Sequence, residues 1–235
     1  RTTARSVENT VPRTRSRTAT MALRYLWFAV GVLVNSFGIA LITKSALGTS
    51  PISSVAYVLS LEFPLTIGQF TFAINMLFIL GQVVLLRRSF RPIQVLQLAV
   101  NIVFSGFLDV SMELLSGVAP ASLPQQLFIL VLGCAILGVG VAIEVAPDVL
   151  MVPGEGLVRA IAITVIDKFG SARFGTIKNL FDISLMVIAT VLSFVFFGGL
   201  NGVGAGTVIS ALLVGRVVNL ANDRLPLIAA IRKLR

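Results

Sequence analysis

The sequence contains no histidine, a single cysteine and few charged residues. Charged residues make up 12% of its 235 residues, about half the share of a typical soluble domain. The absence of histidine argues against imidazole acid–base chemistry and against zinc or haem sites, and one cysteine cannot form an internal disulfide. Cys134 lies in an apolar run, where a free thiol packs as a small hydrophobic side chain. We therefore expect no metal site and no cofactor.

The residues that are abundant are those of a membrane protein. Hydrophobic residues make up 56% of the chain and the mean hydropathy is +0.97. A chain this apolar cannot cover its surface with polar groups, so part of its solvent must be lipid. The net charge of +9 does not indicate nucleic acid, because lysine and arginine gather in the tails and in particular loops, as orientation signals do. We expect a multi-pass protein of the bacterial cytoplasmic membrane, with the lipid bilayer as its main partner.

Six apolar runs are long enough to cross a bilayer as α-helices. They cover residues 23–43, 67–86, 93–115, 127–146, 174–197 and 204–220. Residues 1–22 form a basic arm that we expect to be disordered and cytoplasmic, and residues 223–235 form a basic cytoplasmic tail. The predicted fold class is an all-α integral membrane protein with six transmembrane helices.

Two further apolar pieces, residues 51–63 and 153–166, are too short to cross. Thirteen residues of helix reach about 20 Å, short of a hydrocarbon core of about 30 Å. The order span, short piece, span, span occurs twice, which predicts a first membrane repeat at 23–116 and a second at 123–222. A shift of 102 residues aligns Gly38 with Gly140, Ala40 with Ala142 and Pro51 with Pro153.

The distribution of positive charge decides between two topologies. If both short pieces enter the membrane and return, the basic arm, the basic residues 87–91, those at 159–173 and the tail share one side. If they cross, the basic residues 87–91 move outside, against the positive-inside rule. We therefore predict two re-entrant half-helices and three crossings per repeat. An odd number of crossings makes the two repeats inverted, with both termini cytoplasmic.

Four motifs of the chain resemble the bacterial YczE-like family, which is related to YitT-type membrane proteins. The motifs are KSALGTSP at 44–51, PGEGLVRAI at 153–161, FGTIKNLFDI at 174–183 and GVGAGTVISALLVG at 202–215. The similarity covers essentially the whole chain after residue 22. It implies a multi-span cytoplasmic-membrane protein, for which transport is the usual supposition. Ile52 stands where this resemblance leads us to expect an aromatic residue, so the site there is expected to be shaped differently.

Each short piece begins at a proline, which suits the first position of a helix. Ser50 precedes Pro51 as an N-cap residue, with Thr49 beside it. The inverted symmetry would bring the Pro51 and Pro153 ends together near the midplane, where free backbone N–H groups can hold an anionic group. The alternative is a pair of tight turns in a packed bundle. Lys44 either attracts an anion toward this site or extends to the lipid headgroups.

The second short piece carries an acid in its first turn. Glu155, after Gly154, either neutralises this helix end, pairs with Arg159 one turn on, or couples a proton or cation. In the fifth span Lys178 and Asp182 lie one turn apart. A carboxylate this deep costs about 2.5–3.5 kcal/mol unless it is paired or faces water. Asp182 is therefore either half of an ion pair or a functional group.

Three more residues complete the candidate solute site. Asn75 is the repeat counterpart of Asp182 and either lines a polar path or makes an interhelical hydrogen bond. Thr207 lies in the motif that opens the sixth span. Arg216 near the end of that span either binds an anion, marks the cytoplasmic side, or pairs with an acid. The candidate acids are Glu144, Asp148 and Asp182.

The leading hypothesis is a transporter or facilitator of a small polar, anionic solute, with Glu155 and Asp182 as proton-coupling groups. A passive channel of the same architecture and a non-transporting membrane subunit are the alternatives, and homo-oligomer formation stays open. Ser50 with Lys44 could act as nucleophile and base, but no Gly-x-Ser-x-Gly, histidine or metal pattern supports an enzyme. We expect no enzymatic activity and no nucleic-acid partner.

Overall fold

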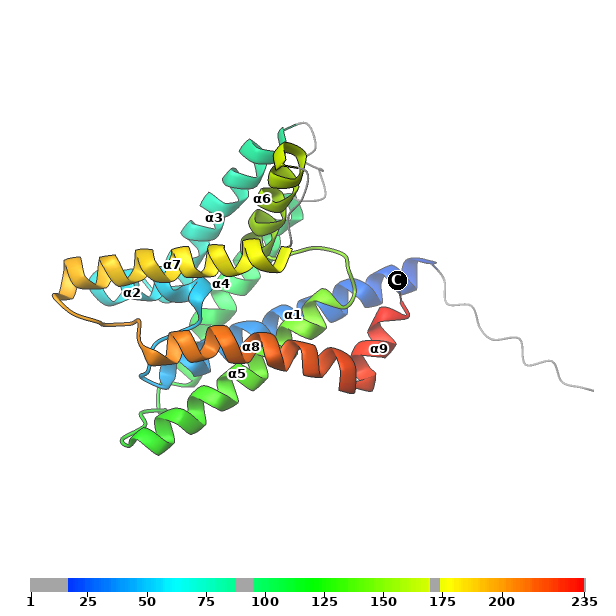
Figure 1. The fold of residues 1–235 in the computed structure, drawn as a ribbon. Coiled ribbons are helices and arrows are strands. Elements are labelled where there is room, and N and C mark those ends of the chain that lie inside the picture. Colours follow the sequence, from blue (N-terminus) through cyan, green and yellow to red (C-terminus); the bar gives the residue numbers. More distant parts are fainter. Residues whose placement is uncertain (1–16, 88–94, 170–173, 235) are drawn as a thin grey trace, which may run out of the picture.

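The computed structural model describes residues 17–87, 95–169 and 174–234, which contain helices and no β-strand. Figure 1 shows their arrangement. In chain order the helices are α1 (Arg17–Lys44), the 3-10 helix η1 (Pro51–Ser53), α2 (Ser54–Glu62), α3 (Ile67–Leu86), α4 (Leu96–Leu114), α5 (Leu123–Val145), α6 (Pro153–Phe169), α7 (Phe174–Phe197), α8 (Ala205–Arg224) and α9 (Pro226–Arg232).

Six of these helices are long and apolar enough to cross a membrane, namely α1, α3, α4, α5, α7 and α8. Their outward faces carry large apolar side chains. In the most apolar windows of α7 and α8 only 17% and 22% of the residues are buried inside the protein. Apolar surface of this extent is stable only against lipid. The prediction of an all-α membrane protein with six candidate spans is therefore confirmed.

The two ends of the chain differ from the prediction. Helix α1 begins at Arg17, so residues 17–22 of the predicted disordered arm are helical, and the rest of that arm lies outside the described residues. The basic tail contains the short helix α9. Pro226 opens it, and its buried side chains Ile228 and Ile231 pack with Ala221 of α8 and Ile143 of α5. The apolar residues of the tail, spaced three apart, explain this helix.

Helices α1 and α5 form the centre of the bundle and pack in antiparallel directions. Glycines on each helix let the two backbones approach closely. A Cβ on Gly38 would lie 2.6 Å from the Leu137 Cα, and one on Gly140 would lie 2.6 Å from the Asn35 N. As residue numbers rise along α1, the contacted numbers fall along α5. The glycine contacts that show this order are Gly31 with Glu144, Asn35 with Gly140, Gly38 with Leu137 and Ile42 with Gly133.

The other helices are arranged around this central pair. Helix α4 packs on α1, and α8 packs on α5. Helix α3 lies beside α6 and α2 lies beside α7, as Figure 1 also shows. Helix α3 begins with a capping box, in which the Thr66 side chain accepts from the Gln69 N–H and the Gln69 side chain accepts from the Thr66 N–H. The α4 carboxylate of Asp109 also binds this end, since it accepts from the Gly68 N–H at 2.8 Å and from the Thr66 hydroxyl at 2.6 Å.

The two short pieces are helical where the sequence predicts them. The first consists of η1 and α2 and ends just before Phe63 and Pro64, because the residue before a proline disfavours the helical conformation. The second, α6, has 17 residues and continues to Phe169, three residues past its predicted end. At 1.5 Å per residue it reaches about 25 Å, still below a hydrocarbon core of about 30 Å.

Candidate functional site

The two short pieces begin side by side inside the bundle. A Cβ added at Gly154 would overlap the Ile52 side chain and lie 3.7 Å from the Phe78 ring. Pro51, Pro153 and Gly154 are all buried. The structure therefore brings together the two proline-led helix starts that the sequence placed in one site. Ile52 fills the space between them, and only a glycine at 154 leaves room for its side chain.

The start of η1 is surrounded by a cluster of buried hydroxyl groups, which we call the hydroxyl cluster. The Thr49 hydroxyl shares a 2.6 Å hydrogen bond with Thr43, and the Thr49 N–H donates to the Thr207 hydroxyl at 3.2 Å. The Ser210 hydroxyl donates to the Thr207 carbonyl at 2.9 Å. Three predicted site residues, Thr49, Ser50 and Thr207, thus lie together. The members of the hydroxyl cluster are Thr43, Thr49, Ser50, Ser53, Thr207 and Ser210.

Glycines hold the start of α8 against the loop before η1. Gly48 has a φ of +123°, a conformation that a side chain would strain. A Cβ at Gly206 would lie 2.7 Å from the Leu47 carbonyl oxygen, to which the Gly206 N–H donates at 2.8 Å. This close approach is what places the Thr207 hydroxyl within reach of Thr49.

The two cations proposed for anion binding, Lys44 and Arg216, make no polar contact with the other site residues in the described parts of the chain. Lys44 ends α1 close in sequence to the hydroxyl cluster, is half-buried, and forms no hydrogen bond or ion pair within the described residues. Arg216 is exposed on α8 and is likewise unpaired there. The pairing of Arg216 with an acid of another span is not formed, because its side chain faces outward from the bundle.

Four charged residues of α5, α6 and α7 form a second polar group, and we call it the acid cluster. It consists of Glu144, Glu155, Lys178 and Asp182. The Lys178 Nζ pairs with Asp182 Oδ2 at 3.2 Å, and their side chains are 34% and 19% exposed. Glu144 is fully buried, and the charges of Glu155 and Lys178 act on it. Glu155 makes no ion pair with Arg159, which is exposed. The predicted Lys178–Asp182 pair is therefore formed, while Glu155 makes no ion pair within the described parts of the chain.

Side-chain amides join α3, α4 and α6 in a third group. The Asn75 Nδ2 donates to Asn101 Oδ1 at 2.8 Å, and the Gln82 Nε2 donates to Gln97 Oε1 at 2.9 Å. The Gln82 Nε2 also donates to the Pro153 carbonyl at 3.0 Å. Asn75 thus makes an interhelical hydrogen bond, which was one of its two predicted roles. Gln82 connects this group to the start of α6.

Several residues of the site were not among the predicted ones. Glu144, Gln82 and Gln97 are buried inside or at the ends of membrane spans, and their polarity within apolar runs is the signal that could have marked them. Thr43, Ser53 and Ser210 of the hydroxyl cluster were also missed, and they give no such signal, because a hydroxyl can bond back to its own helix backbone. Thr71 was not predicted either, and its buried hydroxyl has no hydrogen-bond partner among the described residues.

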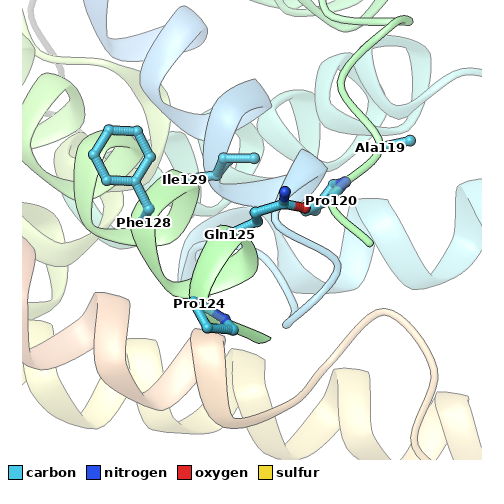
Figure 2. Close-up of a pocket in the computed structure, with 6 residues that line it drawn as sticks. All are labelled: Ala119, Pro120, Pro124, Gln125, Phe128 and Ile129. Carbon is cyan, nitrogen blue, oxygen red and sulfur yellow. The ribbon is translucent and has the colours of Figure 1, made fainter. Parts of the chain in front are cut away.

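An apolar surface hollow of about 520 Å³ lies at the loop between α4 and α5 (Figure 2). It contains none of the predicted site residues. Phe128, on its rim, is 69% exposed and belongs to the apolar outer face of α5. The lining residues are Ala119, Pro120, Pro124, Gln125, Phe128 and Ile129.

The helices and buried polar groups define a multi-span α-helical membrane protein with short helices that begin inside the bundle. The chain belongs to a family of unknown function, DUF6198, whose model matches residues 22–223. It is 26% identical to the uncharacterized membrane protein YczE of Bacillus subtilis (strain 168) over 202 residues, covering 84% of this chain and 85% of YczE. It is 27% identical to the uncharacterized protein YyaS of the same strain over 199 residues, covering 84% and 91% of the two chains. These relatives make it a YczE-like protein, as its motifs indicated. No solved structure matches the chain.

Proposed function

We propose that the protein is a membrane transporter or facilitator of a small polar, anionic solute that binds at the start of η1. One observation carries this proposal. Two short helices begin against each other in the interior, with Ile52 of one touching Gly154 of the other. Simple turns are rarely found twice within the hydrocarbon region, because their backbone polar groups would be unsatisfied there. The discontinuous helices of transporters begin at this depth and bind solutes with their N-termini.

The contacts between α1 and α5 support an inverted repeat. The contact of Gly31 with Glu144 recurs as that of Gly133 with Ile42, in which each residue is moved by 102 positions. Contacts that repeat in this crossed manner are those of a two-fold axis. Because α1 and α5 are antiparallel, the axis relates two repeats of opposite orientation. Ile52 and Gly154 are also 102 positions apart, so they would lie on the same axis.

The packing of the other helices agrees with this symmetry. The repeat would relate α1 to α5, α2 to α6, α3 to α7 and α4 to α8. Accordingly α4 packs on α1 as α8 packs on α5, and α3 packs on α6 as α7 packs on α2. One departure is that α3 packs on α4, whereas α7 and α8 are not closely packed in the described parts of the chain. In a transporter that works by rocking one helix bundle against the other, the two repeats would exchange these two packing arrangements between the outward-open and inward-open states.

Length and charge favour re-entrant short helices. Neither η1 with α2 nor α6 reaches across a bilayer. With both of them returning to the side they entered, Arg17, Arg24, Arg87 and Arg232 all fall on one side. Both termini are then cytoplasmic, in line with the positive-inside rule.

The two short-helix starts differ in charge, and this difference selects the anion site. The η1 start has buried hydroxyls, and Lys44 is close to it in sequence, while the Ser53 and Ser54 N–H groups already donate to the Ser50 and Pro51 carbonyls. The α6 start has Glu155 in its first turn, and the charges of Glu155 and Glu144 act on each other. An anion accepts hydrogen bonds from hydroxyl groups and is repelled by carboxylates, so it would bind at the η1 start.

The arrangement favours a transporter over a passive channel. A channel needs a continuous polar path, whereas the apolar contact of Ile52 with Gly154 and Phe78 separates the hydroxyl cluster from the acid cluster. The protein would then have to change its packing to move a solute past this point. A membrane subunit without transport would have no use for buried carboxylates, which are costly to keep.

Uptake of radiolabelled anions into proteoliposomes tests the proposal. The purified protein would be challenged in turn with phosphate, sulfate, succinate and lactate. We expect uptake of at least one anion, which is strongly reduced in Thr49→Val and Lys44→Gln and retained in Ser116→Ala, a matched change on the exposed α4–α5 loop. If folded wild type takes up none of the four anions, or if Ser116→Ala loses as much as Thr49→Val, the proposal is contradicted.

A further inference from the structure

Glu144 is placed where a carboxylate charge is hardest to keep. Its side chain is 1% exposed, and it lies in the last turn of α5, at the negative end of the helix dipole. It contacts Gly31, the fifteenth residue of the 28-residue α1. Within the apolar residues 23–43 of α1, that position is about 12 Å from the first residue and about 18 Å from the last. Glu144 therefore lies opposite the apolar part of a spanning helix.

Among the described residues, the Asn35 side chain and the Val152 backbone N–H act on the Glu144 carboxylate, and only the Asn35 bond has full hydrogen-bond geometry. Oε2 accepts from the Asn35 Nδ2 at 2.8 Å. Oε1 is buried and has no hydrogen-bond partner among the described residues. A charged carboxylate with one oxygen unsatisfied in an apolar interior is strongly disfavoured, and such groups neutralise instead.

Lys178 is the cation whose charge acts on Glu144, and it is already paired with Asp182 of the same helix. Helix α6 contributes Glu155, a second negative charge that acts on Glu144. Arg24 of α1 donates to the carbonyls of Pro147 and Asp148 beyond the end of α5. The cations of α6, α8 and the C-terminal segment whose side chains the structure describes are exposed. They are Arg159, Arg216, Arg224, Arg232 and Lys233.

We propose that Glu144 is a proton-binding site, which holds a proton in the arrangement seen here. Three carboxylates and one ammonium leave two negative charges on Glu144 and Glu155, and a proton on the more deeply buried acid removes one of them. A proton requires no cavity and so fits the close packing of Gly31 against Glu144. Resting on the proposed function, the inference makes the proton the coupling ion that moves with the anion.

Asn35 can serve both states of Glu144. Its Nδ2 donates to the carboxylate, and rotation of the amide would let its Oδ1 accept from the O–H of the acid. Asn35 is thus a positioning residue that lets the carboxyl gain and lose a proton without a change in backbone packing. Its place in α1 also links the proton to the α1–α5 contact at the centre of the bundle.

Infrared spectroscopy of the reconstituted protein tests the inference without any solute. We expect wild type at pH 7 to show the C=O stretching band of a protonated carboxylic acid. The band should shift when the protein is made with ¹³C-labelled glutamate and should disappear in Glu144→Gln. Asp223→Asn, on the exposed end of α8, should keep the band. The isotope shift needs no mutation, so the test remains valid if Glu144→Gln does not fold.

Two results would overturn the inference. One is a wild-type spectrum without a glutamate-dependent band at pH 7. The other is a band that survives in Glu144→Gln and disappears in Glu155→Gln, which would place the proton on Glu155. Failure of the anion-uptake assay leaves the spectrum unaffected, so the proton site and the transport function can fail separately. For an anion that is taken up, a pH gradient should accelerate uptake in wild type and have no effect in Glu144→Gln. An equal response in both would also overturn the inference.

Discussion

The glycine contacts between α1 and α5 predict how the bundle responds to one added methyl group. In Gly38→Ala the new Cβ would lie 2.6 Å from the Leu137 Cα and N. These are backbone atoms that cannot rotate away, so the two helices must separate. Overpacking of this kind costs about 1–3 kcal/mol. Gly106→Ala on α4 is the matched control, because a Cβ there meets nothing within 4 Å.

The measurement can use the protein's own thiol. Cys134 lies on α5 and is fully buried, so a thiol-reactive dye labels it only on unfolding. Both substitutions gain helix propensity of up to about 1 kcal/mol, which cancels in the comparison. A difference of about 2 kcal/mol corresponds to a melting temperature about 4–8 °C lower for Gly38→Ala than for Gly106→Ala. Equal melting temperatures for the two variants would refute the close α1–α5 packing.

Three other predictions concern named hydrogen bonds and ion pairs. Gln82→Leu alone should lower the free energy of unfolding by about 1–3 kcal/mol, because it leaves the buried Gln97 amide unpaired. The double change with Gln97→Leu should cost less than the sum of the two single changes. Strictly additive effects of the two changes on thermal unfolding would contradict the pairing. Asp109→Ala should destabilise the start of α3 by about 1 kcal/mol, because the Gly68 N–H loses its acceptor. Glu113→Ala, one turn later on an exposed position of α4, should have little effect. Equal hydrogen exchange of the Gly68 amide in both variants would argue against this hydrogen bond. The stability lost in Asp182→Leu should be restored in part by adding Lys178→Leu, since this removes the unpaired, half-buried cation. Expression level and melting temperature measure the effect. Single variants as stable as the double variant would show that the ion pair contributes nothing.

Much of the fold could be predicted from the sequence. Hydropathy located all six spans, because a helix in lipid needs about 20 apolar residues and leaves a strong signal. The boundaries of α3 agree at both ends, where Thr66 caps the start and basic residues follow the end. The extension of α1 back to Arg17 was missed because its first residues are polar. Whether such a segment is helical depends on its helix propensity and on its continuity with an apolar span more than on its polarity.

The candidate site was predicted only in part. Residues adjacent in sequence to the two prolines could be found, because proline and its neighbours mark a helix start. The proposed repeat predicted that the Pro51 and Pro153 ends approach each other, but it did not predict the contact of Ile52 with Gly154. Glu144 was named only as a partner for Arg216, because its burial depends on Gly31 and Asn35 of α1 packing over the end of α5. The grouping of the hydroxyls of Thr43, Thr49 and Thr207 likewise depends on contacts between distant segments, which spacing along the chain does not reveal.

The side of the membrane on which Leu65 lies tests the re-entrant arrangement most directly. Leu65 connects α2 with α3 and is exposed. In a Cys134→Ala background, Leu65→Cys should react in intact cells with a membrane-impermeant maleimide added outside, because a re-entrant α2 returns to the side it entered. Lys233→Cys, near the end of the chain, should react only after lysis. If Leu65→Cys also reacts only after lysis, α2 crosses the membrane, and the inverted repeat and the solute site between the two short helices are both contradicted.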